Sequence, residues 1–152
     1  MVIPADTYCL NREKLEAAIT PNTKAIIPID YTGQPADMDE INEIAARHGI
    51  AVIEDSAHSL GATYKGRTVG SLADMSIFSF HPVKHVAMGE GGLIATDDDA
   101  LAAALRLFRT HGITNDGTAM RLGSQAADKD SGGNASANAD DRVPWYYEMQ
   151  EL

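Results

Sequence analysis

Residues 76–84 read Ser-Ile-Phe-Ser-Phe-His-Pro-Val-Lys, and residues 89–92 read Gly-Glu-Gly-Gly. Side chains of different kinds alternate from Met75 to Phe80, which predicts a β-strand with two different faces. Pro82 has no backbone N–H for a strand ladder, so we expect the strand to end beside it. Lys84 then follows a strand end, where open α/β sheets bind their ligands. A partly desolvated lysine in such a place can lose its proton and act as an amine nucleophile.

An acidic residue follows another predicted strand further upstream. Residues 50–53 read Ile-Ala-Val-Ile, and Glu54 and Asp55 come directly after them. Parallel strands place their carboxyl ends at one edge of a sheet, where open α/β sheets bind ligands, so both strand ends point to the same site. This coincidence favours a functional Lys84 over the ordinary alternative, a solvated loop lysine.

The rest of the pattern predicts an α/β fold with a mainly parallel sheet and flanking helices. Residues 25–29 form an apolar run, which is typical of a strand buried on both faces. Residues 37–48 have helical periodicity, with Asp37 as the expected N-cap and Gly49 as the stop. Strand, helix and strand in this order form a βαβ unit. The remaining expected elements are a short helix within 6–20, a hairpin at 62–69, a strand at 92–96 and a helix at 97–110 whose Leu101, Leu105 and Phe108 face the core.

Composition narrows the class of protein. The 152 residues suit one domain with a moderate core, and 22 acidic against 12 basic residues give a net charge of −10. This charge argues against nucleic acid or an anionic membrane as a partner. Neither a signal peptide nor a membrane-spanning run is evident. The single Cys9 cannot form an internal disulfide, which suits a reducing compartment, and we expect a cytoplasmic protein.

Three motifs resemble, in order and spacing, the core of the DegT/DnrJ/EryC1/StrS sugar aminotransferases. These enzymes have the fold-type-I architecture and use pyridoxal 5'-phosphate (PLP). The pseudaminic-acid branch, which makes a 4-amino sugar precursor, is most similar around Asp30-Tyr31-Thr32-Gly33-Gln34-Pro35. The three motifs are residues 54–61 (Glu-Asp-Ser-Ala-His-Ser-Leu-Gly), 78–84 and 89–92, and the whole resemblance covers about 2–112 and 144–152.

The resemblance implies a role for each matching residue. Lys84 would hold PLP covalently and move a proton between substrate and cofactor carbons. Asp55 would pair with the protonated pyridine nitrogen and keep the ring an electron sink. His58 would lie against the ring, and Ser79 would bind the cofactor phosphate. Tyr31 could approach the substrate or the ring, and no metal is expected.

Each of these residues except Lys84 also keeps an ordinary structural alternative. Asp favours caps and turns, so Asp55 could be only a turn residue. A lone histidine such as His58 is more often a packed side chain. Ser79 could be an unremarkable strand serine, and Tyr31 a loop aromatic packed on the sheet.

The implied reaction is a ping-pong transamination. L-glutamate would donate the amino group, and a nucleotide-diphosphate 4-keto-6-deoxy sugar, most simply UDP-linked, would accept it; a homo-oligomer is expected. A non-catalytic α/β binding or self-association module derived from the same fold is the alternative. Some relatives are sugar dehydratases with histidine in place of the lysine, and Lys84 disfavours that reaction.

Residue ranges with different compositions suggest how the chain is organised. Residues 1–112 would be a partial PLP-binding large domain. Residues 113–143 are rich in Gly, Ser, Asn and Asp, which predicts a flexible insertion, and residues 144–152 would be an aromatic C-terminal segment of the same domain. The family's N-terminal phosphate loop and smaller C-terminal domain find no match in the chain. We therefore expect a truncated large domain, weak or inactive alone, that self-associates through exposed apolar surfaces.

Overall fold

The computed structural model describes residues 3, 6–114 and 148–149. The contacts within the chain divide it into two units, residues 1–99 and 100–152. The first unit contains α1 (Arg12–Ala18), β1 (Ala25–Ile26), a 3-10 turn (Tyr31–Gly33), α2 (Met38–His48), β2 (Ala51–Asp55), β3 (Thr63–Tyr64), β4 (Arg67–Thr68), β5 (Met75–Ser79) and β6 (Gly92–Ala95). The helix α3 (Asp99–Arg109) and the strands β7 (Ile113–Thr114) and β8 (Glu148–Met149) follow.

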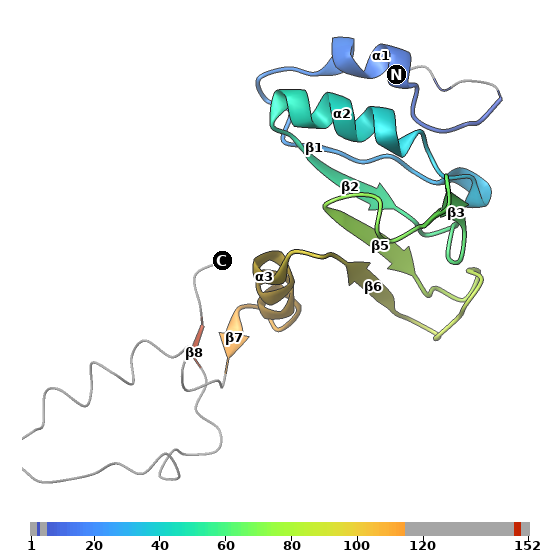
Figure 1. Ribbon diagram of the computed structural model, residues 1–152. Helices are drawn as coiled ribbons and strands as arrows, with labels where there is room; N and C mark the ends of the chain where they lie inside the picture. The colour runs from blue at the N-terminus through green and yellow to red at the C-terminus, as the bar shows by residue number, and fades with distance from the viewer. Residues whose placement is uncertain (1–2, 4–5, 115–147, 150–152) are drawn as a thin grey trace, which may run out of the picture. The chain divides into compact units, whose positions relative to one another are not determined.

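A four-stranded sheet in the order β1-β2-β5-β6 organises the first unit (Figure 1). β1, β2 and β5 are parallel, whereas β6 is antiparallel to β5 because it returns through a single loop. β1, α2 and β2 form the predicted βαβ unit. The structure therefore confirms the predicted α/β class with a mainly parallel sheet.

The core lies between the sheet and α2. Ile26 of β1, Val52 of β2 and Phe78 of β5 are buried on the sheet face that α2 covers. α1 lies on the same side, and its Leu15 is buried. The helix stripe predicted from periodicity is confirmed, since the buried residues of α2 are Met38, Ile41, Ile44 and Ala45.

Two predictions about burial are wrong. The run at residues 25–29 is not buried on both faces, because Ile27 is 56% exposed and Ile29 is 48% exposed. Successive strand side chains point to opposite faces, and both α1 and α2 lie on one face. α3 has no buried residue, and Phe108 is 56% exposed, so its apolar stripe does not face a core within the described residues.

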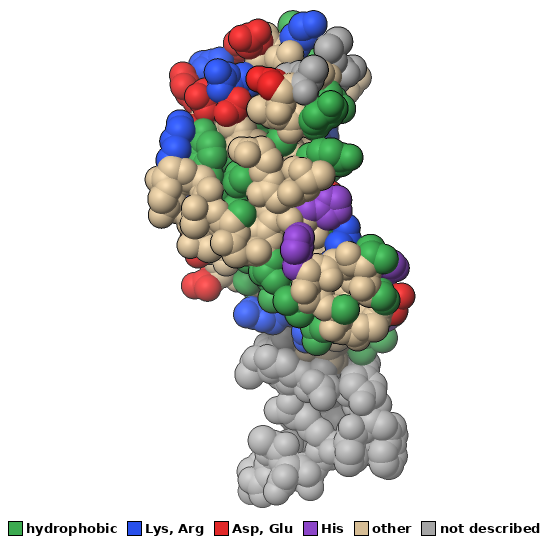
Figure 2. Space-filling model, turned by 90° about the vertical axis from the view of Figure 1, so that its right-hand side faces the viewer, with side chains coloured by type: hydrophobic (Ala, Val, Ile, Leu, Met, Phe, Trp, Pro, Cys, Tyr) green, Lys and Arg blue, Asp and Glu red, His purple; other side chains and the backbone are tan. Residues whose placement is uncertain are grey.

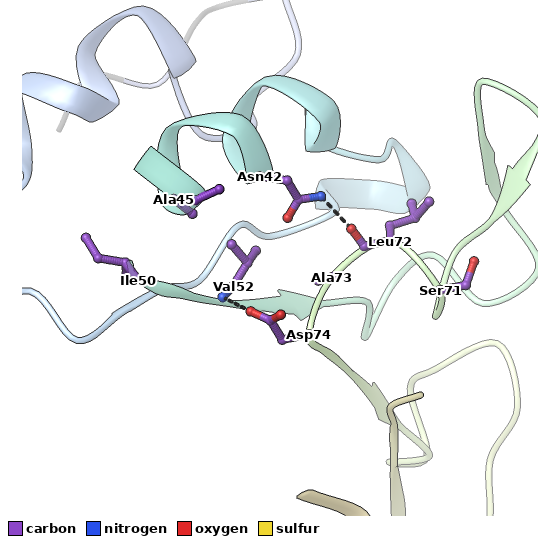
Figure 3. Close-up of a pocket in the computed structure, with 9 residues that line it drawn as sticks. Asn42, Ala45, Ile50, Val52, Ser71, Leu72, Ala73 and Asp74 are labelled. Atoms are coloured by element: carbon purple, nitrogen blue, oxygen red, sulfur yellow. Dashed lines mark hydrogen bonds between the residues drawn. The ribbon is translucent and has the colours of Figure 1, made fainter. Parts of the chain in front are cut away.

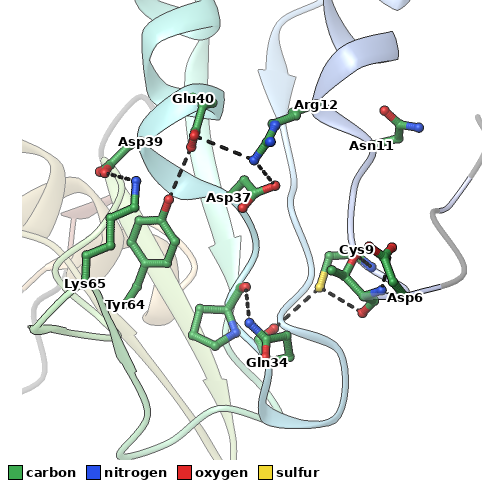
Figure 4. Close-up of polar contacts among 12 residues, drawn as sticks. Asp6, Cys9, Asn11, Arg12, Gln34, Asp37, Asp39, Glu40, Tyr64 and Lys65 are labelled. Carbon is green, nitrogen blue, oxygen red and sulfur yellow. Dashed lines mark hydrogen bonds and ion pairs between the residues drawn. The ribbon is translucent and has the colours of Figure 1, made fainter.

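The ends of α2 show which capping predictions hold. Asp37 occupies the N-cap position but makes no capping hydrogen bond. Its carboxylate instead pairs with the Arg12 guanidinium at 2.6 Å, which joins α1 to α2 (Figure 4). Gly49 ends the helix in the left-handed conformation, with φ of 63°, as predicted.

The predicted hairpin is β3 and β4, with its turn at Lys65 and Gly66. Both turn residues have positive φ, 48° and 82°. Ion pairs attach this hairpin to α2: Lys65 Nζ lies 2.8 Å from Asp39 Oδ2, and Arg67 also pairs with Asp39 (Figure 4). The hydrogen bond from Lys65 lowers the pKa of Asp39.

Residues of the second unit are described only in part. β7 pairs with β8 in the antiparallel direction, so the first two residues of the predicted insertion at 113–143 form a strand. The remainder of that insertion, and most of the aromatic segment at 144–152, lie outside the described residues. No helix within the described part of the chain is long and apolar enough to cross a membrane.

Replacing Ile41 with alanine should lower the free energy of unfolding by roughly 2–5 kcal/mol, because it leaves a cavity between α2 and the sheet. The Ile41 side chain is completely buried. Urea unfolding followed by circular dichroism would measure the loss. Glu43→Ala, on the exposed side of the same helix, is the matched control and should change stability little. Equal losses for both variants would show that α2 does not form the core described here.

Candidate cofactor site

The carboxyl ends of β1, β2 and β5 meet at one edge of the sheet because these strands are parallel. The strand ends and loops at this edge carry all five site residues predicted from the sequence. Figure 2 views the molecule from this side and shows histidine and hydrophobic side chains at the surface. The five residues are Tyr31, Asp55, His58, Ser79 and Lys84.

Asp55 and Ser79 share one face of the sheet. Asp55 is the last residue of β2 and lies opposite Ile77 in the ladder with β5. Ser79 is the last residue of β5 and points to the same side as Ile77, because alternate strand residues share a face. Both side chains are half-buried. This is the face that α1 and α2 do not cover.

Exposed isoleucines flank Asp55 on both neighbouring strands. Ile29 pairs with Asp55 on one side and is 48% exposed, while Ile77 on the other side is 37% exposed. A carboxylate between two exposed apolar side chains suits an apolar ring whose nitrogen carries a proton.

Two backbone hydrogen bonds hold Asp55 against the segment that follows β1. Its N–H donates to Pro28 O at 2.8 Å, and its carbonyl accepts from Asp30 N at 3.0 Å. Its side-chain Oδ1 accepts from Ala57 N at 3.1 Å. Asp55 therefore does act as a turn residue, which was its structural alternative in the sequence analysis. This role uses one of its two carboxylate oxygens.

Lys84 lies in the loop between β5 and β6. Phe80 N donates to Gly91 O at 2.9 Å, which closes the loop at its base. Gly92 permits this close return, because a Cβ there would lie 3.1 Å from Phe78 O. The Lys84 side chain is half-buried and makes no ion pair with a carboxylate among the described residues.

His58 and Tyr31 bring two of the edge loops together. Their ring centroids are 6.3 Å apart with planes at 57°, and Tyr8 extends the aromatic group at 6.1 Å from Tyr31. Gly33 has φ of 92°, and a Cβ there would lie 3.2 Å from His58 O. The sequence did not indicate Tyr8, since it precedes α1 in a segment without a recognisable motif.

The structure thus groups four predicted residues in two pairs. Asp55 and Ser79 share a sheet face, and Tyr31 and His58 are in ring contact. Lys84 leaves the same edge, but no hydrogen bond within the described part of the chain joins it to the other four.

A hollow of about 370 Å³ lies elsewhere, at the amino ends of the strands. Two hydrogen bonds cross its wall, from Asn42 Nδ2 to Leu72 O at 2.7 Å and from Val52 N to Asp74 Oδ2 at 2.8 Å (Figure 3). Val52 lies near the start of β2, and Asp74 directly precedes β5. The hollow is therefore at the opposite edge from the predicted site, and it contains none of the predicted residues.

The sequence profile of the DegT/DnrJ/EryC1/StrS aminotransferase family matches residues 2–135. The chain belongs to this family. The resemblance inferred from the three motifs is therefore confirmed.

Individual relatives of the chain are much longer than it is. An uncharacterized protein of Methanocaldococcus jannaschii, MJ1066, is 41% identical over 98% of this chain and 34% of its own length. The aminotransferase from Psychrobacter cryohalolentis is 32% identical, with a TM-score of 0.74, over 99% of this chain and 33% of its own. Helicobacter pylori PseC, an aminotransferase of pseudaminic acid biosynthesis, is 33% identical, with a TM-score of 0.70, over 73% of this chain and 30% of its own. The chain therefore spans about a third of the length of these relatives.

Pyridoxal phosphate is the cofactor that this family membership indicates. One matching structure of a Streptococcus pneumoniae protein is a PLP form. Another, the E. coli GDP-4-keto-6-deoxy-D-mannose-3-dehydratase, contains hydrated PLP. The residues at the sheet edge of the chain fit that group, because they offer a carboxylate flanked by apolar side chains, a hydroxyl on the same face, an imidazole and an amine.

Proposed function

We propose that the chain is the cofactor-binding core of a nucleotide-sugar aminotransferase. The enzyme transfers an amino group from L-glutamate to a nucleotide-diphosphate 4-keto-6-deoxy sugar, most simply a UDP-linked one. The observation that carries the proposal is the shared sheet face of Asp55 and Ser79, with Ile29 and Ile77 beside the carboxylate. Family membership supports the reaction class, and the likeness to PseC supports the pseudaminic-acid branch.

Each residue has a task that its position allows. Bound pyridoxal phosphate supplies an electron sink for carbanion chemistry. The Asp55 carboxylate would face the protonated ring nitrogen, and the Ser79 hydroxyl would donate a hydrogen bond to the phosphate. The Lys84 amine would attach the cofactor and carry the proton at the substrate carbon. His58 would lie against the ring, and Tyr31 would contact the ring or the substrate.

Reductive trapping tests this proposal on the chain itself. The chain would be incubated with pyridoxal phosphate, reduced with borohydride and mapped by mass spectrometry of its peptides. We expect the cofactor on Lys84 and little on the exposed Lys14, Lys24 and Lys65. Addition of L-glutamate before reduction should lower the trapped fraction. Modification spread evenly over the lysines would contradict a dedicated site.

The alternative function is a non-catalytic α/β binding or self-association module. It predicts no selective trapping at Lys84 and no response to L-glutamate. A sugar dehydratase of this family would carry histidine where this chain has Lys84, so the lysine continues to favour amino transfer.

Self-association through the open sheet face is a separate expectation. Exposed isoleucines occupy that face on β5, on β6 and in the segment that follows β1: Ile77, Ile94, Ile27 and Ile29. Several exposed apolar side chains on one sheet face favour a contact with another surface. Replacing Ile27 and Ile94 with lysine should weaken self-association at least about tenfold, because each charge would lose its water in the contact. Light scattering at several concentrations would measure this.

Val83→Lys is the matched control for self-association. Val83 is 78% exposed in the loop after β5, away from the strands. It should leave the association constant unchanged. A wild-type chain that stays monomeric at high concentration would refute the expected oligomer.

A further inference from the structure

A buried polar layer lies behind the candidate site, on the sheet face that the helices cover. Its members are at most 2% exposed, and no lysine, arginine or histidine is buried among the described residues. Buried polar groups of this kind need hydrogen-bond partners, and buried charges need neutralisation. The layer consists of Asp30, Glu54, Ser56, Ser59 and Ser76.

Asp30 joins the two loops that carry the aromatic contacts of the site. Its Oδ1 accepts from Ala36 N at 3.0 Å, which closes the loop containing Tyr31. Its Oδ2 accepts from the Ser59 hydroxyl at 2.7 Å, which holds the loop containing His58. One carboxyl group therefore anchors both partners of the Tyr31–His58 ring contact.

Glu54 joins the next two segments but has one oxygen without a partner. Its Oε2 accepts from the Ser76 hydroxyl at 2.6 Å and from Gly70 N at 3.3 Å. Its Oε1 is buried and lacks any hydrogen bond. A carboxyl group with one orphan oxygen in such a place indicates a missing proton or donor.

Asp30 and Glu54 lie on the same face of neighbouring strands. Ile29 pairs with Asp55, and both point to the open face of the sheet. Asp30 follows Ile29 and Glu54 precedes Asp55, so both of these side chains point to the opposite, helix-covered face. Burial is the main reason why the pKa of Asp30 is raised to about 6, and the neighbouring carboxylate of Glu54 raises that pKa further. Hydrogen bonds from Ser59 and Ala36 act in the opposite direction.

We propose that Asp30 and Glu54 share one proton in the folded chain, and that this proton keeps closed the two loops that carry Tyr31 and His58. The functional part of this inference rests on the proposed cofactor site. The shared proton gives the orphan Glu54 oxygen a partner, and it avoids two negative charges in a layer without a cation. Asp30 and Glu54 are positioning residues, since they act on the site through the loops.

Other titratable groups face the layer without neutralising it. Cys9 Sγ donates to Gln34 O at 3.5 Å, and burial raises the pKa of its thiol. Asp37 pairs with Arg12 at the surface. Neither group supplies a positive charge to Asp30.

The first test is the pH dependence of unfolding, which needs no cofactor. The folded chain holds the proton on Asp30 more tightly than the unfolded chain, whose Asp pKa is near 3.8. The stability from this proton is therefore complete below that value and is lost as the pH rises through about 6. From pH 4 to 8 the unfolding constant of wild type should rise roughly 100-fold relative to that of Asp30→Asn, because one pKa unit corresponds to tenfold.

The amide in Asp30→Asn offers a permanent donor and keeps an acceptor for the loop. If Asp30→Asn does not fold, Glu54→Gln is the second variant to measure. Its amide supplies the donor from the Glu54 side and should flatten the same pH dependence. Glu43→Gln removes an exposed carboxylate on α2 and should keep the wild-type profile. If the buried-site variants also keep the wild-type profile, there is no shared proton, and the orphan oxygen has another partner such as water.

The second test concerns positioning and is measured as the dissociation constant of pyridoxal phosphate at pH 6. Asp30→Ala loses both loop hydrogen bonds. It should bind at least about tenfold more weakly than Asp30→Asn, whose oxygen can accept from Ala36 N and whose amide can donate to the Ser59 oxygen. Equal affinities would overturn the positioning role even if the pH result holds. If wild type binds no cofactor, the proposed function fails, while the pH test still decides the shared proton.

Discussion

Lys84→Ala should reduce amino transfer by at least about 10³-fold, because it removes the amine that holds the cofactor and carries the proton. Its fold should be unchanged, since the Lys84 side chain makes no ion pair among the described residues. The measurement is a single turnover with L-glutamate at saturating cofactor, followed by visible absorbance. Single turnover separates the chemical step from cofactor affinity.

Lys65→Ala is the control for this experiment. Lys65 lies in the β3–β4 turn, where it pairs with Asp39, and removing it should leave the turnover rate within about twofold, because an exposed ion pair contributes little to the folded state. An active Lys84→Ala protein would rule out Lys84 as the covalent residue. The chain would then retain only the binding or self-association function.

Asp55→Asn and Asp55→Ala should both lower the turnover rate by roughly 10²–10⁴-fold, a magnitude typical of a lost charge-stabilising group. The asparagine variant retains an oxygen for the Ala57 N–H, whereas alanine does not. Comparing the two separates the turn role of Asp55 from its charge. If the charge matters, asparagine is as harmful as alanine.

Stability serves as the internal control for Asp55. Loss of the hydrogen bond to Ala57 should lower the free energy of unfolding of Asp55→Ala by about 0.5–1.5 kcal/mol, and that of Asp55→Asn by less. An asparagine variant with wild-type turnover would assign Asp55 to the turn alone. Urea unfolding of the same preparations would show whether a rate loss reflects chemistry or folding.

Local patterns were sufficient to predict most elements of the fold. The helix at Met38–His48, the left-handed Gly49 and the Lys65–Gly66 turn all follow from side-chain periodicity and backbone preferences that act over a few residues. The strand that precedes Lys84 could also be predicted, because its side chains alternate between two kinds and Pro82 marks its end. The motifs in and after these elements also identified the family.

Failures of the sequence reading have a common cause. The run at residues 25–29 has the composition of a doubly buried strand, but which face is covered depends on where α1 and α2 pack. Asp37 has a residue type that favours the N-cap, yet its carboxylate forms an ion pair with Arg12 of another helix. In each case a contact between segments distant in sequence overrides a local preference.

By itself, the sequence determined the α/β class, the family and the identity of the edge residues, since these depend on residue type and short-range order. Only the tertiary structure decided that Asp30 and Glu54 meet in one buried layer, that Tyr8 joins Tyr31, and which face of the sheet stays open. Strand register and helix placement bring such residues together. Both depend on packing between distant segments, which no local pattern specifies.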